Sequence, residues 1–292
     1  MYIGKRKSRR CDMKKILISV APVAATDILI NPRAIAKDVI ACSKAGAGMV
    51  HLHVRDLNGQ LTPDLSLLEE TVRYIRSECD IVIQASTGGV SNLTIEERCA
   101  PVFADWVEAN SLNVGSVNLG DAVYRNPIEE VHYCVEQIIR NHKTPEIEVF
   151  EIGMIKTVRD LAERFDFVKP ILFSIVLGHI GAAPATVRTL KSMLEAFYEF
   201  FPGEGEALWG ITHAHRTDFE IMKAALDMGA STVRIGFEDS NYLNPTTQVD
   251  SNVPLVEAVA DIVKTKGMMP ATPAEIRAML NIHPLKPGVF GR

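Results

Sequence analysis

The sequence predicts an α/β fold, a (β/α)8 TIM barrel in a single domain. Three observations predict it. Short apolar runs alternate with amphipathic segments of helical length, which is the pattern of βαβ units and a parallel sheet. There are eight such runs, the number that a closed barrel of this kind needs. No linker, low-complexity tract or block of charge divides the 292 residues, a length that one α/β barrel can occupy.

The apolar runs are the predicted strands, and the amphipathic segments between them are the predicted helices. The strands are expected at residues 16–20, 49–54, 81–85, 106–112, 147–152, 172–177, 208–212 and 232–237. The helices are expected at residues 32–45, 66–77, 128–141, 158–164, 186–200, 218–228 and 254–266.

Composition excludes several classes of protein. Hydrophobic residues make up 47% and charged residues 23% of the chain, as in an ordinary globular enzyme. The net charge of −5 argues against a nucleic-acid partner, which requires basic surface. No stretch approaches the ~18 apolar residues of a membrane span, so no membrane partner is expected. The five cysteines are odd in number and never in CxxC spacing, which predicts a reducing, cytoplasmic location.

The N-terminus is rich in basic residues and precedes the first apolar run, an arrangement that superficially resembles a secretory signal. That run contains Pro22 and leads directly into a helical pattern, so it fits better as the first core strand. We therefore expect residues 1–14 to form a disordered basic leader, with Met13 as an alternative start, and residues 15–292 to form the barrel.

A metal site is predicted from the second and eighth runs. Side chains alternate between the two faces of a strand, so His51 and His53 share one face. The same alternation in the eighth run points Arg234 and Glu238 into the barrel. Two imidazoles and a carboxylate form a set that leaves an open coordination position on Zn²⁺. The alternatives are two satisfied core histidines and a structural ion pair between Arg234 and Glu238.

Polar and glycine-rich segments follow most of the predicted strands. In a (β/α)8 barrel the C-terminal ends of the strands carry the active site. Any one of these segments can equally be ordinary turn chemistry. The segments contain Ser86–Gly89, Asn113, Glu151, Gly178–Pro184 and Asp239.

Several motifs together resemble the beta-keto acid cleavage enzymes, over about residues 15 to 280. The most specific signal is HLHVRD at residues 51–56 followed by VRIGFED at residues 233–239. STGG at residues 86–89, VLGHIGAAPAT at 176–186 and ATPAEIRAML at 271–280 agree with it. The resemblance implies a zinc-containing (β/α)8 barrel, usually a homotetramer. Such an enzyme exchanges the acyl portion of a 3-keto acid with acetyl-CoA, giving acetoacetate and a new acyl-CoA.

The resemblance also implies roles for individual residues. It makes His51, His53 and Glu238 the ligands of one zinc ion per chain, in agreement with the strand alternation. Asp239 corresponds to the catalytic base, with Arg234 orienting it. The substrate would be bound by Ser86, Thr87, Gly88, Gly89, Asn113 and Glu151, and coenzyme A by the loop containing Gly178 and Gly181.

The chain departs from the family in three places. Ala182 stands where a second glycine is more usual, which puts part of the coenzyme contact in doubt. The loop after the first strand is short and offers only Thr26 and Asp27, so a substrate with a distal amine is not implied. A second HxH, His213 and His215, follows the seventh strand and suggests a second metal, a substrate contact or plain loop polarity.

Two other functions remain open at this point. An amidohydrolase-type zinc enzyme also carries HxH on a barrel strand, but on the first one and with further histidines after strands five and six. A non-catalytic metal-binding barrel would bind zinc and exchange no acyl group.

Overall fold

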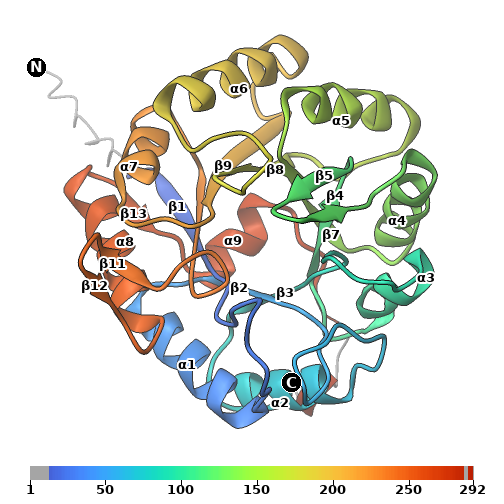
Figure 1. Cartoon of the computed structure of the whole chain (residues 1–292), viewed down its shortest axis with the longest axis vertical. Coiled ribbons are helices and arrows are strands. Elements are labelled where there is room, and N and C mark those ends of the chain that lie inside the picture. Colours follow the sequence, from blue (N-terminus) through green and yellow to red (C-terminus); the bar gives the residue numbers. More distant parts are fainter. Residues whose placement is uncertain (1–12, 286–288, 292) are drawn as a thin grey trace, which may run out of the picture.

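The computed structural model describes residues 13–285 and 289–291, which form the predicted closed (β/α)8 barrel. Eight parallel strands form the inner ring and helices surround it (Figure 1). The last barrel strand pairs with the first and closes the ring. The barrel strands are β1 (Lys15–Val20), β2 (Met49–Leu52), β3 (Val82–Ala85), β4 (Ala109–Asn113), β7 (Thr144–Val149), β8 (Ile171–Leu177), β9 (Ala207–His213) and β10 (Thr232–Ile235).

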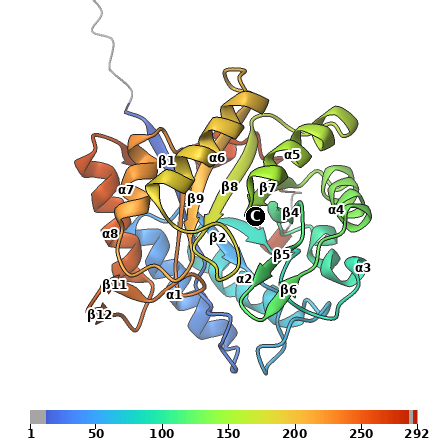
Figure 2. The ribbon, with the colours of Figure 1, turned by 45° about the horizontal axis from the view of Figure 1, so that its top comes forward.

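The outer helices lie close to where the sequence predicts them (Figure 2). Local signals fix their ends: the Asn31 side chain accepts a hydrogen bond from the Ala34 N–H at the start of the first helix, and Gly46 ends it at a φ of 125°. These helices are α1 (Pro32–Ala45), α2 (Ser66–Glu78), α4 (Ile128–Arg140), α5 (Ile152–Arg164), α6 (Val187–Phe200), α7 (Glu220–Asp227) and α8 (Val253–Thr265).

Some elements were not predicted. A short helix and a 3-10 turn, α3 (Ile95–Arg98) and η1 (Ala100–Phe103), link β3 to β4. Two hairpins project from the barrel, β5 (Val117–Leu119) with β6 (Ala122–Tyr124) and β11 (Tyr242–Asn244) with β12 (Thr247–Gln248). The chain then adds β13 (Met269–Pro270), α9 (Pro273–Met279) and η2 (Val289–Gly291).

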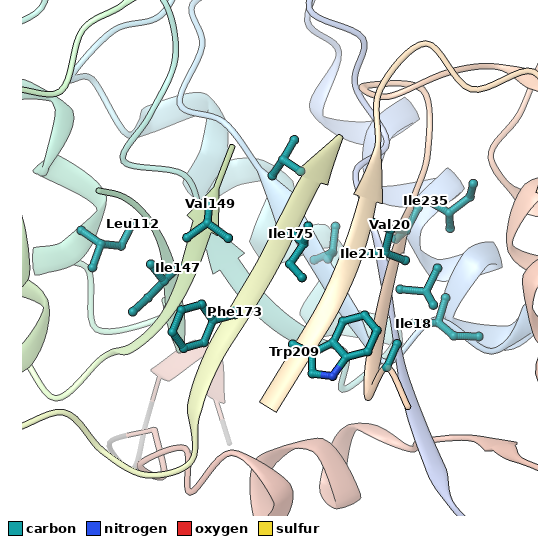
Figure 3. Close-up of a cluster of buried hydrophobic side chains, with 14 of the residues drawn as sticks. Ile18, Val20, Leu112, Ile147, Val149, Phe173, Ile175, Trp209, Ile211 and Ile235 are labelled. Carbon is teal, nitrogen blue, oxygen red and sulfur yellow. The ribbon is translucent and has the colours of Figure 1, made fainter. Parts of the chain in front are cut away.

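The barrel strands bury one face against the helices and the other inside the ring. Figure 3 shows the outward-facing side chains that form the main core, among them Ile18, Phe173 and Trp209. Residues of the opposite parity point into the barrel, so the alternation read from the sequence decides which side chains can meet there.

The inside of the barrel changes character along its axis. At the N-terminal end of the strands, Leu17, Met49, Val82 and Leu172 form a second apolar cluster with Ile276 of α9, which covers this end. Nearer the C-terminal end the buried inward-facing side chains are polar, and they include Ser19, His51, Gln84, Ser111, Glu146, Ser174, Thr212 and Arg234. The polar side chains inside the ring therefore lie toward the C-terminal ends of the strands.

The predicted basic leader covers residues 1–14, of which the structure describes only the last two. Residues 1–12 of the leader lie outside the described residues, while Lys14 donates hydrogen bonds to the carbonyls of Gly229 and Ala230. Within residues 13–285 and 289–291, no helix has both the length and the apolar character needed to cross a membrane.

Candidate active site

The two histidines of β2 and its following loop meet the carboxylate that follows β10. His51 Nε2 lies 3.4 Å from His53 Nε2, and Glu238 Oε1 lies 3.4 Å from His53 Nε2 and 3.7 Å from His51 Nε2. His51 is buried, and the side chains of His53 and Glu238 are 13% and 16% exposed. These three residues are the one candidate metal-binding group within the described part of the chain.

The spacing of these atoms suits a small tetrahedral cation. Zinc bonds of about 2.0–2.1 Å at tetrahedral angles put neighbouring ligand atoms roughly 3.3 Å apart. The three observed separations are 3.4, 3.4 and 3.7 Å. Three donors leave a fourth position open on a tetrahedral cation.

The charge state of the cluster also suits a cation. Burial lowers the pKa of His51, which favours the neutral imidazole that binds metals. Burial alone would raise the pKa of Glu238, but the charge of Arg234 and the neighbouring histidines hold it well below its ordinary value. The site therefore presents the neutral imidazole of His51 and the anionic oxygen of Glu238 beside the imidazole of His53.

Arg234 connects this cluster to two further carboxylates. Its Nε and Nη2 donate to Asp239 Oδ2 and Oδ1 at 3.1 and 2.6 Å. Its Nη1 donates to Glu148 Oε1 at 3.1 Å, and Nη2 also lies 3.3 Å from Glu238 Oε1. Burial would lower the pKa of Arg234, but the three carboxylates raise it well above its ordinary value, so the guanidinium stays charged.

The contacts of Arg234 bear on whether Glu238 is a metal ligand or the partner of Arg234 in a structural ion pair. The short bidentate contact of Arg234 goes to Asp239, and Glu238 receives only the longest of its contacts. Arg234 is therefore not the sole partner of Glu238, because Glu238 Oε1 also lies close to both imidazoles.

The buried Asp239 lies within reach of this cluster and keeps acceptor capacity. A carboxylate has about four lone-pair positions, and Arg234 occupies one on each oxygen. The remaining positions can accept a proton. The geometry thus combines a buried carboxylate, a fixed positive charge and a metal-type ligand set at the C-terminal end of the barrel.

The loop 86–89 lies beside this end of the barrel but uses its backbone donors internally. The Gly88 N–H donates to Ser86 Oγ, and the Gly89 N–H donates to the Tyr124 hydroxyl. Thr87 donates through both its N–H and its hydroxyl to Ser111. The Ser86 hydroxyl is engaged as well, because it accepts from the Gly88 N–H and lies 3.1 Å from Ser111 Oγ.

The carboxylate from β7 that joins the network is Glu148, which the sequence analysis missed. Asn113 donates from Nδ2 to Glu148 Oε2 at 3.0 Å, so Asn113 does reach the network, and its buried Oδ1 has no hydrogen-bond partner. Glu151 is instead solvent-exposed at the N-terminus of α5. The signal for Glu148 was the alternation in TPEIEV at residues 144–149, where Glu146 and Glu148 share one face.

The glycines predicted to contact coenzyme A have packing roles of their own. Gly178 has a φ of 98°, and a Cβ there would lie 2.5 Å from the Ala214 carbonyl oxygen. Gly181 has a φ of 87°, and a Cβ there would lie 2.8 Å from Asn118 Cβ. These contacts explain both glycines without a ligand, so the coenzyme role stays a prediction.

The second HxH does not form a second metal group within the described residues. His215 instead packs edge-on against His179, with ring centroids 5.7 Å apart, and its N–H donates to the Asp239 carbonyl at 2.9 Å. Burial lowers the pKa of His179 and of His213, which favours neutral imidazoles. These side chains form polar surroundings for Asp239.

Arg55 and Asp56, which follow the first HxH, form hydrogen bonds that stabilise the loop after β2. Arg55 donates to the carbonyls of Ala25 and Gly59, and Asp56 Oδ1 accepts from the N–H groups of Asn58 and Gln60. Their contacts are structural.

Known proteins match this chain over most of its length. The relatives include the 3-keto-5-aminohexanoate cleavage enzyme of Acetoanaerobium sticklandii, 32% identical over 92% of this chain and 99% of the relative. They also include the 3,5-dioxohexanoate:acetyl-CoA acetone transferase of Paraburkholderia graminis, 27% identical over 92% of this chain and 96% of the relative.

The fold has solved counterparts. The complex of ObcA with oxaloacetate superposes with a TM-score of 0.76 at 20% identity, over 87% of this chain and 67% of ObcA, which supports the barrel architecture. The model of the beta-keto acid cleavage enzyme family matches residues 21–282. By this match, and by its identity to the curated relatives, the chain belongs to the beta-keto acid cleavage enzyme family.

Proposed function

We propose that this enzyme uses one zinc ion, held by His51, His53 and Glu238, to exchange the acyl portion of a β-keto acid with acetyl-CoA, giving acetoacetate and a new acyl-CoA. The observation that carries the zinc proposal is the ligand spacing of 3.4, 3.4 and 3.7 Å. The use of acetyl-CoA is supported by the names of relatives, such as the 3-oxoadipate:acetyl-CoA acetyltransferase of Cupriavidus necator.

The zinc ion would polarise the ketone oxygen of the keto acid as a Lewis acid. Asp239 removes a proton from the carbon between the ketone and the carboxylate, and the electron pair left on that carbon attacks the thioester carbonyl. Coenzyme A thiolate leaves. The thiolate then attacks the original ketone carbon, the carbon–carbon bond breaks, and the acetoacetate carbanion takes its proton back from Asp239.

The other residues of the site have roles that follow from their contacts. Arg234 grips both oxygens of Asp239 and supplies positive charge beside the developing anions. Glu148 accepts a hydrogen bond from Nη1 of Arg234 and so helps to hold the guanidinium in place. The hydroxyl of Ser86 and the unpaired Oδ1 of Asn113 are the groups proposed to position the substrate.

The remaining substrate-binding residues have weaker support. Thr87, Gly88 and Gly89 shape the loop that carries Ser86, because their donors are used internally. The exposed Glu151 could act only on a distant part of the substrate. Gly178 and Gly181 keep their proposed place in the coenzyme A loop because they lie at the C-terminal end of β8.

The proposed substrate lacks a distal amine. Asp27 is the acidic group in the loop between β1 and α1, and its Oδ2 accepts a hydrogen bond from the Ala24 N–H at 3.0 Å. That carboxylate stabilises its own turn. Keto acids with neutral or acidic tails should therefore be preferred.

We also propose a homo-oligomer, a tetramer by family resemblance, in the cytoplasm. Exposed apolar side chains on adjacent loops, Ile28, Leu29 and Leu57, support an interface between copies. The net charge of −5 again speaks against nucleic acid as a partner.

The decisive assay incubates the protein with acetyl-CoA and a panel of β-keto acids and measures acetoacetate and acyl-CoA by mass spectrometry. The panel contains 3-keto-5-aminohexanoate, 3,5-dioxohexanoate, 3-oxoadipate and simple alkyl keto acids. Asp239→Asn should keep its metal and lose activity by roughly 10²–10⁴-fold, the usual contribution of a general base. Asp261→Asn, on the exposed face of α8, is the matched control and should keep full activity.

A protein that binds zinc but produces no acyl-CoA from any keto acid would instead be a non-catalytic metal-binding barrel. An Asp239→Asn variant with unchanged turnover would remove Asp239 from the mechanism and leave the reaction itself in place.

A further inference from the structure

A buried chain of hydrogen bonds runs from the proposed metal ligand His51 to Glu146, and the proposed mechanism makes no use of it. His51 Nδ1 lies 2.6 Å from Gln84 Oε1. Gln84 Nε2 donates to Glu146 Oε2 at 2.6 Å. The three residues come from the neighbouring strands β2 and β3 and from β7, and they are 2%, 0% and 4% exposed.

The direction of these bonds is set by chemistry. A glutamine amide has a donor end and an acceptor end. In its ionised form, which predominates above its pKa of about 7, Glu146 can only accept. Gln84 then turns its NH₂ group toward Glu146 and its oxygen toward His51, which is the orientation in the structure. An amide oxygen also only accepts, so His51 Nδ1 must carry the proton.

That proton position decides whether His51 can bind a metal. In a neutral imidazole only one nitrogen carries a proton. With the proton on Nδ1, the lone pair lies on Nε2, the atom that faces His53 and Glu238. With the proton on Nε2, the same ring could not be a ligand through that atom.

We propose that Gln84 and Glu146 are positioning residues that fix the Nδ1–H tautomer of His51 and so preorganise the metal site before any metal binds. This inference rests on the proposed zinc site. Groups behind metal-binding histidines commonly change metal affinity by about 10–100-fold. Here the positioning group is a neutral amide, and a carboxylate one step further away sets the amide's orientation.

The arrangement is costly, which argues against an incidental contact. Burial raises the pKa of Glu146 to about 7, so ionising this carboxyl group inside the barrel lowers the stability of the folded protein. Gln84 Nε2 is its hydrogen-bond donor, and the group has no ion pair within the described residues. A purely structural position would be filled at lower cost by an apolar side chain.

The first test is the tautomer of His51 in the metal-free wild-type protein. With ¹⁵N-labelled histidine, the ring nitrogens of His51 are assigned by their absence from the spectrum of His51→Ala. We expect the proton on Nδ1 in the wild type and a substantial Nε2–H population in Gln84→Met, which is close in shape and lacks the amide. A wild-type His51 protonated on Nε2 overturns the proposal without any variant.

The second test is zinc affinity, measured by competition with a chelator. Gln84→Met and Glu146→Leu should each bind zinc about 10–100-fold more weakly than the wild type. Thr212→Val is the matched control, because its hydroxyl pairs with Ser174 at 2.8 Å inside the same barrel and is not connected to His51. Zinc affinities within about twofold of this control overturn the proposal.

The two proposals can fail separately. If the wild type binds no zinc, the proposed function fails, while the tautomer of the metal-free protein still decides the role of Gln84. If the wild type binds zinc and both variants bind it equally well, only the positioning role fails.

Discussion

His215 is held in a backbone conformation that few side chains tolerate. Its φ is 55°, in the left-handed region, and its N–H donates to the carbonyl of Asp239. Such strain is typically kept at functional sites, where the surrounding structure can enforce it. The position of His215 next to the proposed base and against His179 is consistent with a role in shaping this end of the barrel.

A pair of variants isolates the backbone strain at this position. Both His215→Gly and His215→Ala remove the imidazole, but only glycine adopts positive φ without steric cost. The free energy of unfolding of the Gly variant should therefore exceed that of the Ala variant by about 1 kcal/mol, measured by chemical denaturation. Equal stabilities would mean that the loop relaxes and stores no strain.

The alternation of side chains suggested His51, His53 and Glu238 as one group, and the structure brings them together although His53 follows the end of β2 and Glu238 lies in the turn after β10. The alternation did not identify Glu148 or Gln84. The predicted fifth strand began at residue 147, so Glu146 and Glu148 lay outside or at its edge, and Glu151 was chosen instead. Gln84 carries no charge, and nothing in the sequence signals which neighbour it faces.

At the scale of elements, the strands and long helices were predictable because each has its own apolar periodicity. The start of α5 was not. The apolar run 147–152 contains both the end of β7 and the first residue of α5, so composition alone places no boundary within it. The hairpins β5–β6 and β11–β12 were missed because their strands are only two or three residues long and show little alternation. The two-residue loop Gly120-Asp121 between Leu119 and Ala122 was an available local signal for the first hairpin.

Helix α9 closes the barrel at its N-terminal end. It covers the N-terminal end of the barrel, opposite the candidate site, and buries Ile276 completely among Leu17, Met49 and Val82. A capping box between Thr272 and Glu275 fixes its start. The chain therefore separates the element that seals the barrel from the loops that carry chemistry.

This separation predicts that stability and activity respond differently to changes in α9. Ile276→Ala should lower the free energy of unfolding by roughly 2–5 kcal/mol, as for other buried large-to-small changes. The zinc content and the kcat of the folded protein should be unchanged. Ala278→Ser, on the exposed side of the same helix, is the control. A large loss of kcat in folded Ile276→Ala would show that the two ends of the barrel are coupled.

At the scale of the whole molecule, the polar half of the barrel interior costs stability. Glu146 is the clearest case, because burial, helped by Glu148 and Asp239 and opposed by Gln84 and Arg234, raises its pKa from 4.5 to about 7. The unfolded chain releases this proton at lower pH than the folded protein does. The contribution of Glu146 to the free energy of unfolding therefore falls as the pH rises from 4.5 to about 7.

The resulting pH dependence can be measured. Between pH 4.5 and about 7, the free energy of unfolding of metal-free wild type should fall relative to that of Glu146→Gln, by a total on the order of 3 kcal/mol. Above this interval the difference should be constant. The comparison cancels groups that titrate equally in both proteins. Parallel stability profiles across the interval would show that Glu146 is ionised throughout.

The central claim is that acyl exchange depends on a metal held by the two histidines and Glu238. The most direct measurement compares acetoacetate formation by the protein as purified, after removal of its metal, and after restoration of zinc, with the zinc content determined each time. We predict about one zinc per chain, loss of activity by at least about 100-fold on removal, and recovery on restoration. His53→Ala should neither retain zinc nor recover. A metal-free protein that forms acetoacetate at the full rate would contradict the claim.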